Sequence, residues 1–254
     1  MYKRLFLGML FMVGLLCTSA SALDPLGPPA ATVDKGAWGI GIESSYSDLE
    51  IERLPTSWSS ASRTVDIEMW KVYAKLVYGV SENVTGFVRV GVASMDWGPI
   101  TGSHREPEGE GDWRFPAWGG GFAATLSESG DTTWGCILQV SEARLVGDEG
   151  ALPDEDEGNF SIRLTEIQFA VGPTWKASDT VRIYGGPFAA ANRGTWEDNI
   201  DGDSPRKPIE EETYWGGYLG ILAEMGKNAN LNIEGMMLAD GGWAVAGGVM
   251  WRCK

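Results

Sequence analysis

The feature that most restricts the fold is a period-2 alternation of apolar residues with small or polar ones, which recurs along most of the chain. Such alternation is typical of β-strands that separate two different environments. About ten segments of strand length show the pattern. The expected strands span residues 37–46, 66–78, 84–95, 115–126, 133–142, 162–175, 181–191, 214–225, 231–239 and 242–252.

The connections between these strands alternate in length. Short turns are expected at 79–83, 127–131, 177–179 and 226–230, and long acidic loops at 47–65, 96–114, 143–161 and 192–213. Only the last connection, at 240–241, is short where a long one is due. Strict alternation is what an up-and-down meander produces when its two ends face different compartments. The sequence therefore predicts an all-β, transmembrane, antiparallel barrel, with ten strands expected and 8 or 12 as alternatives.

The two faces of each expected strand differ in charge. In the strand at 66–78, Trp70, Leu76 and Tyr78 share one face, and Lys71 and Lys75 share the other. The apolar faces carry no charge in their central stretches. We expect the other face to line the lumen, with its charges paired, because an isolated charge in a narrow interior is costly. The candidate polar network of the lumen is Glu43, Lys71, Lys75, Arg89, Glu166, Arg182, Glu224, Glu234 and Arg252.

Tryptophan is abundant, with 12 residues, and most of them fall at strand ends. Trp favours the level of lipid headgroups because its ring is apolar while its N–H needs a polar partner. A soluble lipocalin-like barrel or sandwich, the alternative fold, gives no reason to sort Trp to both ends. The expected aromatic girdles contain Trp38, Trp70, Trp97, Trp118, Trp134, Trp175, Trp215, Trp243 and Trp251, whereas Trp58, Trp113 and Trp196 fall in loops.

The first 22 residues have the pattern of a signal peptide. Lys3 and Arg4 form a basic start, an apolar stretch follows, and Ala20-Ser21-Ala22 fits the small-x-small pattern that signal peptidase cleaves. Lipidation at Cys17 is not favoured because Leu16, rather than a small residue, precedes it. The expected organisation is a signal peptide at 1–22, a Pro-rich, unstructured lead-in at 23–35 and the barrel at 36–254.

Charge and composition exclude several functions. A formal net charge of −15 argues against nucleic-acid binding, which needs clustered Lys and Arg. One His and three widely spaced Cys do not provide a multi-His or zinc-ribbon metal site. No cofactor is expected.

The acidic loops are the remaining place where an ion could bind. Clustered carboxylates can hold Ca²⁺ or Mg²⁺, but the stretch 198–203 lacks the ligand spacing of a calcium loop, and a solvated anionic surface is the simpler interpretation. Weak candidates for divalent cations are Asp154, Asp156, Asp198, Asp201 and Asp203.

One hairpin carries a resemblance to a known family. Residues 75–91 combine an aromatic-Gly turn, Asn83 and the return sequence Arg89-Val-Gly91, and residues 169–187 repeat this arrangement. The pattern resembles the small outer-membrane β-barrels of Gram-negative-type bacteria, such as the OmpA barrel, OmpX-like and porin-like proteins. Members commonly end on an aromatic residue that the assembly machinery reads, whereas here Trp251 lies three positions inside the terminus.

The resemblance implies an outer-membrane location with periplasmic termini and long extracellular loops. It also implies contact with outer-membrane lipid and lipopolysaccharide, and with the barrel-assembly machinery during biogenesis. We expect a structural or surface-interaction role with a closed or narrow lumen, and a narrow channel or porin for small solutes or ions is the alternative. Lumen glycines either widen the bore or make room for Tyr73, Tyr184, Tyr218 and Phe188.

An enzyme is the third possibility. Barrel enzymes of the outer membrane normally use a His paired with a carboxylate or a Ser at the rim. The only His is His104, in an acidic, Gly-rich loop. We interpret it as a solvated loop residue and predict no catalytic site.

Overall fold

The computed structural model describes residues 23–52, 64–97, 109–110, 115–148, 159–199, 206–239 and 241–253. The signal peptide, His104, Asp154, Asp156, Asp201 and Asp203 lie outside the described residues. Within the described parts, no helix is long and apolar enough to cross a membrane.

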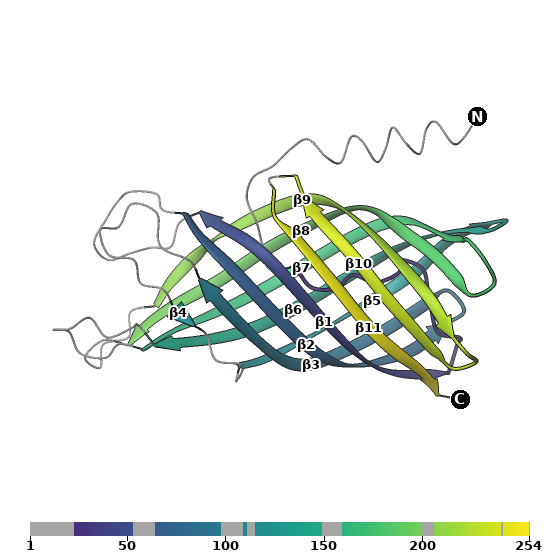
Figure 1. Ribbon diagram of the computed structural model, residues 1–254, viewed down its shortest axis with the longest axis horizontal. Coiled ribbons are helices and arrows are strands. Elements are labelled where there is room, and N and C mark those ends of the chain that lie inside the picture. Colours follow the sequence, from purple (N-terminus) through teal and green to yellow (C-terminus); the bar gives the residue numbers. More distant parts are fainter. Residues whose placement is uncertain are drawn as a thin grey trace.

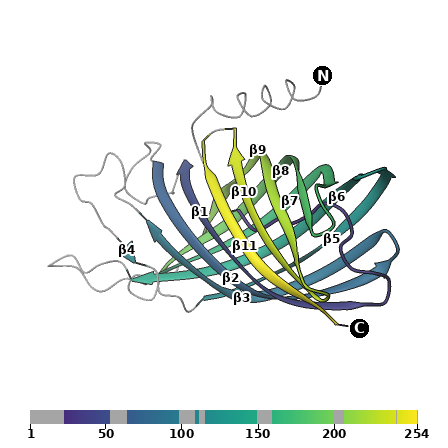
Figure 2. The same ribbon diagram turned by 45° about the vertical axis from the view of Figure 1, so that its right-hand side comes forward.

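Ten long antiparallel strands close into a barrel (Figures 1 and 2). Closure is made by the first and last strands, which pair from Trp38 with Cys253 to Asp48 with Trp243. Each remaining long strand pairs with its neighbours in sequence, and β4 is a two-residue strand beside β3. The ten-strand, up-and-down prediction is confirmed. The strands are β1 (Trp38–Glu52), β2 (Thr64–Ser81), β3 (Val84–Trp97), β4 (Gly109–Glu110), β5 (Phe115–Ser129), β6 (Thr132–Asp148), β7 (Asn159–Lys176), β8 (Val181–Asn199), β9 (Arg206–Met225), β10 (Ala229–Leu238) and β11 (Trp243–Cys253).

Several strands run further toward the long-loop end than predicted. β8 continues to Asn199 and β9 begins at Arg206, and the two pair as far as Glu197 with Arg206. The acidic residues there end the apolar alternation, which is why the sequence predicts a loop for this stretch. Strands beyond the apolar band can be polar on both faces, because water solvates both sides of the sheet there.

The outer wall is apolar, as the alternation predicted. On β2, Trp70, Leu76 and Tyr78 are exposed on the outside, and Lys71 and Tyr73 are buried inside. An exposed apolar wall of this extent is the signature of a surface that faces lipid rather than water.

Eight of the nine candidate girdle tryptophans are exposed on this wall, whereas the side chain of Trp97 lies outside the described part. Those at the short-turn end are Trp38, Trp134, Trp175 and Trp251, and those nearer the long loops are Trp70, Trp118, Trp215 and Trp243. Tyr78 reinforces the first group, with its ring centroid 4.5 Å from that of Trp38.

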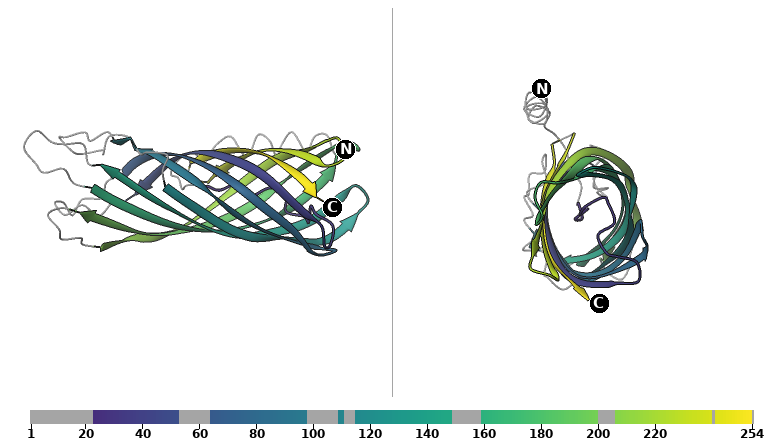
Figure 3. Two further views of the ribbon diagram at one scale, coloured as in Figure 1. Left: turned by 90° about the horizontal axis from the view of Figure 1, so that it is seen from below. Right: turned by 90° about the vertical axis from the view of Figure 1, so that its right-hand side faces the viewer.

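Residues 23–35 are here called the luminal segment: residues 23–33 lie inside the barrel, as the end-on view of Figure 3 shows, and the exposed Asp34 and Lys35 lead to β1. Leu23, Leu26 and Val33 are buried in the interior. At the short-turn end the chain reverses into β1, and the N–H of Gly36 donates to the carbonyl of Gly79 at 2.8 Å. The expectation of an unstructured lead-in needs correction: the segment has no regular secondary structure, but the lumen wall packs around it.

Candidate functional site

Asp24 of the luminal segment is the centre of the polar network in the lumen. Arg89 on β3 donates to Asp24 Oδ2 at 2.8 Å, and Lys71 on β2 donates to Oδ1 at 3.0 Å. The hydroxyl of Tyr73 adds a third donor to Oδ1 at 3.1 Å. The side chain of Asp24 is completely buried. Three charge-assisted bonds to one buried carboxylate hold the segment at a fixed height in the barrel.

Three more of the predicted residues extend this network along the wall. Glu43 on β1 accepts from Arg89 at 3.2 Å and from Lys75 at 2.9 Å. Glu166 on β7 lies 3.8 Å from Lys71 and accepts the backbone N–H of Asp24 at 3.1 Å. The guanidinium of Arg89 also lies over the ring of Tyr73, 4.8 Å from its centroid. Charges from three strands therefore converge on Asp24, and Glu43 on a fourth strand pairs with Arg89.

A second anchor holds the backbone of the segment. Glu234 on β10 accepts the N–H of Leu26 at 2.6 Å and that of Gly27 at 2.8 Å. The hydroxyl of Tyr184 on β8 lies 2.7 Å from the same carboxylate. On the opposite wall, Arg89 and Gln139 both donate to the carbonyl of Pro25, at 3.3 and 3.1 Å. Because the segment makes no regular backbone bonds of its own, these side chains replace water for its polar groups.

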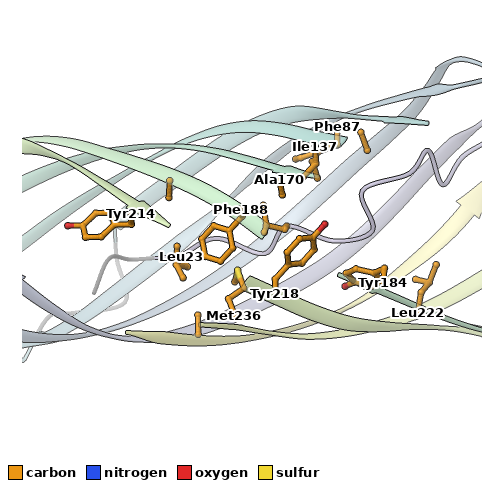
Figure 4. Packing of buried hydrophobic residues seen from close by; sticks show 14 of the residues in the cluster. Leu23, Phe87, Ile137, Ala170, Tyr184, Phe188, Tyr214, Tyr218, Leu222 and Met236 are labelled. Carbon is orange, nitrogen blue, oxygen red and sulfur yellow. The ribbon is translucent and has the colours of Figure 1, made fainter. Parts of the chain in front are cut away.

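Apolar contacts surround the anchors. Leu23 belongs to one buried cluster with Phe188 and Met236, and Figure 4 shows how these side chains fill the lumen. Glycines on the neighbouring strand make room for the rings: a Cβ on Gly216 would lie 2.6 Å from the Phe188 ring, and one on Gly220 would overlap the Tyr184 ring. For these two positions, the lumen glycines accommodate aromatic side chains rather than widening the bore.

The remaining three predicted residues form a separate group at the short-turn end. Glu224 lies 3.3 Å from Arg182 and 3.6 Å from Arg252. Their side chains are 24%, 41% and 31% exposed, so water solvates them. The predicted single network thus consists of five residues around Asp24, the anchor Glu234, and this rim group.

Sequence reasoning missed Asp24. Period-2 alternation identifies lumen-facing residues only within strands, and this residue lies in a Pro-rich stretch with no period. One sequence feature could have indicated Asp24: it is an acid that stands between apolar residues. The predicted lumen residues included five bases and only four acids, so one more acid in the lumen would have balanced their charge.

Beside the luminal segment, a cavity of about 80 Å³ borders Pro25, Glu43, Lys75 and Asn232. That volume holds a few waters and no larger solute. Among the residues whose side chains are described, no three His, Cys, Asp or Glu are placed to hold a metal ion. Asp198 lies in β8, but its side chain is outside the described part.

Comparison with known proteins reveals a likeness of fold. No family model matches the chain, and no curated protein matches its sequence. Among solved structures, the outer membrane protease OmpT from Escherichia coli superposes with a TM-score of 0.52 at 7% identity, covering 88% of this chain and 99% of that one. The translocator domain of the autotransporter NalP from Neisseria meningitidis gives 0.50 at 12% identity, covering 86% and 89%.

The fold is that of an outer-membrane β-barrel.

At such low identity the likeness concerns the fold of this outer-membrane barrel and not its activity. One similar structure is a protease and the other a translocator, so the same architecture serves different functions. What separates one outer-membrane barrel from another is the content of its lumen and its loops. In this one, the lumen contains the luminal segment.

Proposed function

We propose that the protein is a closed outer-membrane barrel that is sealed by its own N-terminal segment and acts through its outer surface, in a structural or surface-interaction role. The observation that carries the proposal is the burial of Asp24 between Arg89 and Lys71 inside the lumen. A barrel of this size leaves little interior space beyond its own side chains, and here a second stretch of chain occupies part of it.

The proposed orientation places the short turns and both ends of the barrel domain in the periplasm, with the long acidic loops outside the cell. The exposed tryptophans would then lie at the two lipid headgroup levels of the outer membrane. The loops are strongly acidic in sequence, and we infer that they bind divalent cations weakly and so bridge to anionic lipopolysaccharide or a surface layer. Calorimetry that shows no Ca²⁺ or Mg²⁺ binding at millimolar concentration would rule out this bridging role.

We further propose that the barrel is not an enzyme. The single His of the sequence lies in an acidic loop, and the lumen carboxylates of Asp24 and Glu43 are held in ion pairs with Lys71, Lys75 and Arg89. Screening the purified barrel for protease and lipid hydrolase activity, beside His104→Ala, tests this. A hydrolysis that disappears in that variant would establish an enzyme instead.

Closure is tested by adding the purified protein to a planar bilayer. The wild type is expected to give no discrete conductance steps. A variant that lacks residues 23–33 is expected to give them, because only the part of the luminal segment inside the barrel is removed and the strands remain. Both proteins are first checked for heat-modifiable migration on gels, which shows that the barrel is folded. Steps of equal size from both proteins would contradict closure and favour the narrow channel.

A further inference from the structure

We propose that cleavage of the leader after Ala22 creates an N-terminal ammonium group on Leu23 inside the barrel, where it pairs with Glu166 and completes the charge balance of the lumen. This inference concerns how the luminal segment is seated. It does not depend on whether the barrel conducts.

The position of Leu23 is the first support. This residue is the first one after the small-x-small pattern, and the structure places it fully buried in the barrel interior beside Phe188 and Met236. The next backbone N–H, that of Asp24, already donates to Glu166 Oε1 at 3.1 Å. Successive backbone nitrogens are about 3 Å apart. The nitrogen of Leu23 is the next one along the chain, so it lies in the same part of the lumen as that carboxylate.

Glu166 itself supplies the second support. Its side chain is 6% exposed, and its second oxygen, Oε2, is buried without a hydrogen-bond partner among the described residues. Its nearest cation, Lys71, is 3.8 Å away and already bonded to Asp24. A buried carboxylate oxygen that lacks a donor is costly. An ammonium group with three donors at Leu23 would satisfy it.

Charge counting gives the third support. The buried lumen acids in the described part are Asp24, Glu43, Glu166 and Glu234, whereas the bases beside them are the buried Lys71 and Arg89 and the half-buried Lys75. The interior is therefore short of one positive charge. The rim bases Arg182 and Arg252 are solvated and paired with Glu224, so they do not supply it. The free N-terminus of Leu23 would add one positive charge at this place.

The chemical step is ordinary peptide hydrolysis. Signal peptidase adds water across the Ala22–Leu23 bond, which leaves a carboxylate on Ala22 and an amine on Leu23 that takes up a proton at neutral pH. Before cleavage that nitrogen is an uncharged amide and cannot balance Glu166. Because the bond precedes a fully buried residue, a membrane-bound peptidase reaches it only before the segment is seated. Cleavage therefore comes first, and seating in the lumen follows.

The test measures the mature terminus and its accessibility. Intact mass of the barrel purified from outer membranes is expected to correspond to a chain that starts at Leu23. The folded protein is then treated with an amine-acetylating reagent at neutral pH, and the acetylation of each peptide is quantified. In the folded protein the α-amine is expected to react at least about tenfold more slowly than exposed Lys227. Once the protein is unfolded in urea it is expected to react faster than Lys227, because the lower ordinary pKa of an α-amine leaves more of it unprotonated at neutral pH.

Two variants separate the ion pair from simple burial. Glu166→Gln is expected to raise acetylation of the α-amine severalfold, whereas Glu224→Gln, a lumen glutamate of the rim group, is expected to leave it unchanged. Should the first variant fail to fold, a chain with Gly-Ser inserted between Ala22 and Leu23 displaces the amine instead and is expected to lose its protection. A mature chain that starts elsewhere, or a wild-type α-amine that reacts as fast as Lys227, would overturn the proposal.

Discussion

At the scale of single residues, the lumen depends on groups that become costly when a partner is removed. Arg89 and Lys71 are buried cations that face Asp24, so each needs that carboxylate. Period-2 alternation predicted that Lys71, Arg89 and Glu166 face inward, because a strand in a barrel wall has only two faces. It could not reveal their shared partner, which lies in a segment without any period.

Replacing Asp24 by Asn is expected to destabilise the barrel. The change leaves Arg89 and Lys71 buried with one counter-charge fewer, and breaking a buried pair costs about 3–5 kcal/mol. The free energy of unfolding in urea, followed by heat-modifiable migration, measures the effect. Asp34→Asn, at an exposed position of the same segment, serves as the control and is expected to behave as wild type. Equal stability of the two variants would mean that the ion pairs contribute nothing.

A glycine in the wall gives a second residue-scale prediction. In Gly220→Ala the added methyl would overlap the Tyr184 ring, which then has to leave its position beside Glu234. Overpacking of this kind costs about 1–3 kcal/mol. Gly217→Ala is the matched control on the same strand, because its Cβ would have only one neighbour, at 3.9 Å. The same urea titration compares them, and a Gly220 variant as stable as the Gly217 variant would contradict the packing argument.

At the scale of elements, the strands were predictable and the luminal segment was not. Alternation gave all ten long strands because each wall strand separates lipid from lumen. It predicted the strand ends at the long-loop side poorly, as in β9, because the sheet continues there into water, where both faces can be polar. A different constraint determines where the luminal segment lies: its length must match the distance from the rim of the barrel to Arg89.

Shortening the luminal segment tests that rule. Deletion of Pro28 and Pro29 removes up to about 7 Å of reach between the rim and Asp24. The shortened chain is expected to lose the Asp24 ion pairs and to show openings in planar bilayers. The double substitution Pro28→Ala with Pro29→Ala keeps the length and is expected to stay closed. A deletion variant that gives no conductance steps would show that the lumen side chains can still bind the segment after it shifts by two residues.

At the scale of the whole molecule, the apolar wall fixes where the barrel resides. Leu138 is 51% exposed and lies on β6 between Trp134 and the level of Trp118, in the middle of the apolar band. Leu138→Arg is expected to cost about 2–4 kcal/mol in lipid, and Leu126→Arg, beside a short turn, about 0–1 kcal/mol. Refolding into phosphatidylcholine vesicles across a urea series measures both. Equal costs would argue that this face is not in hydrocarbon.

The chain reverses between Asp34 and Ala37, beside Gly79, and this reversal makes the luminal segment a tethered ligand of its own barrel. Residues 23–33 are joined to β1 by only a few residues, so their effective concentration at the binding position is set by a very short linker and reaches at least the millimolar range. A synthetic peptide of the same sequence, added to the barrel that lacks these residues, would have to reach a similar concentration to close it. Weak individual contacts are therefore sufficient to keep the lumen filled.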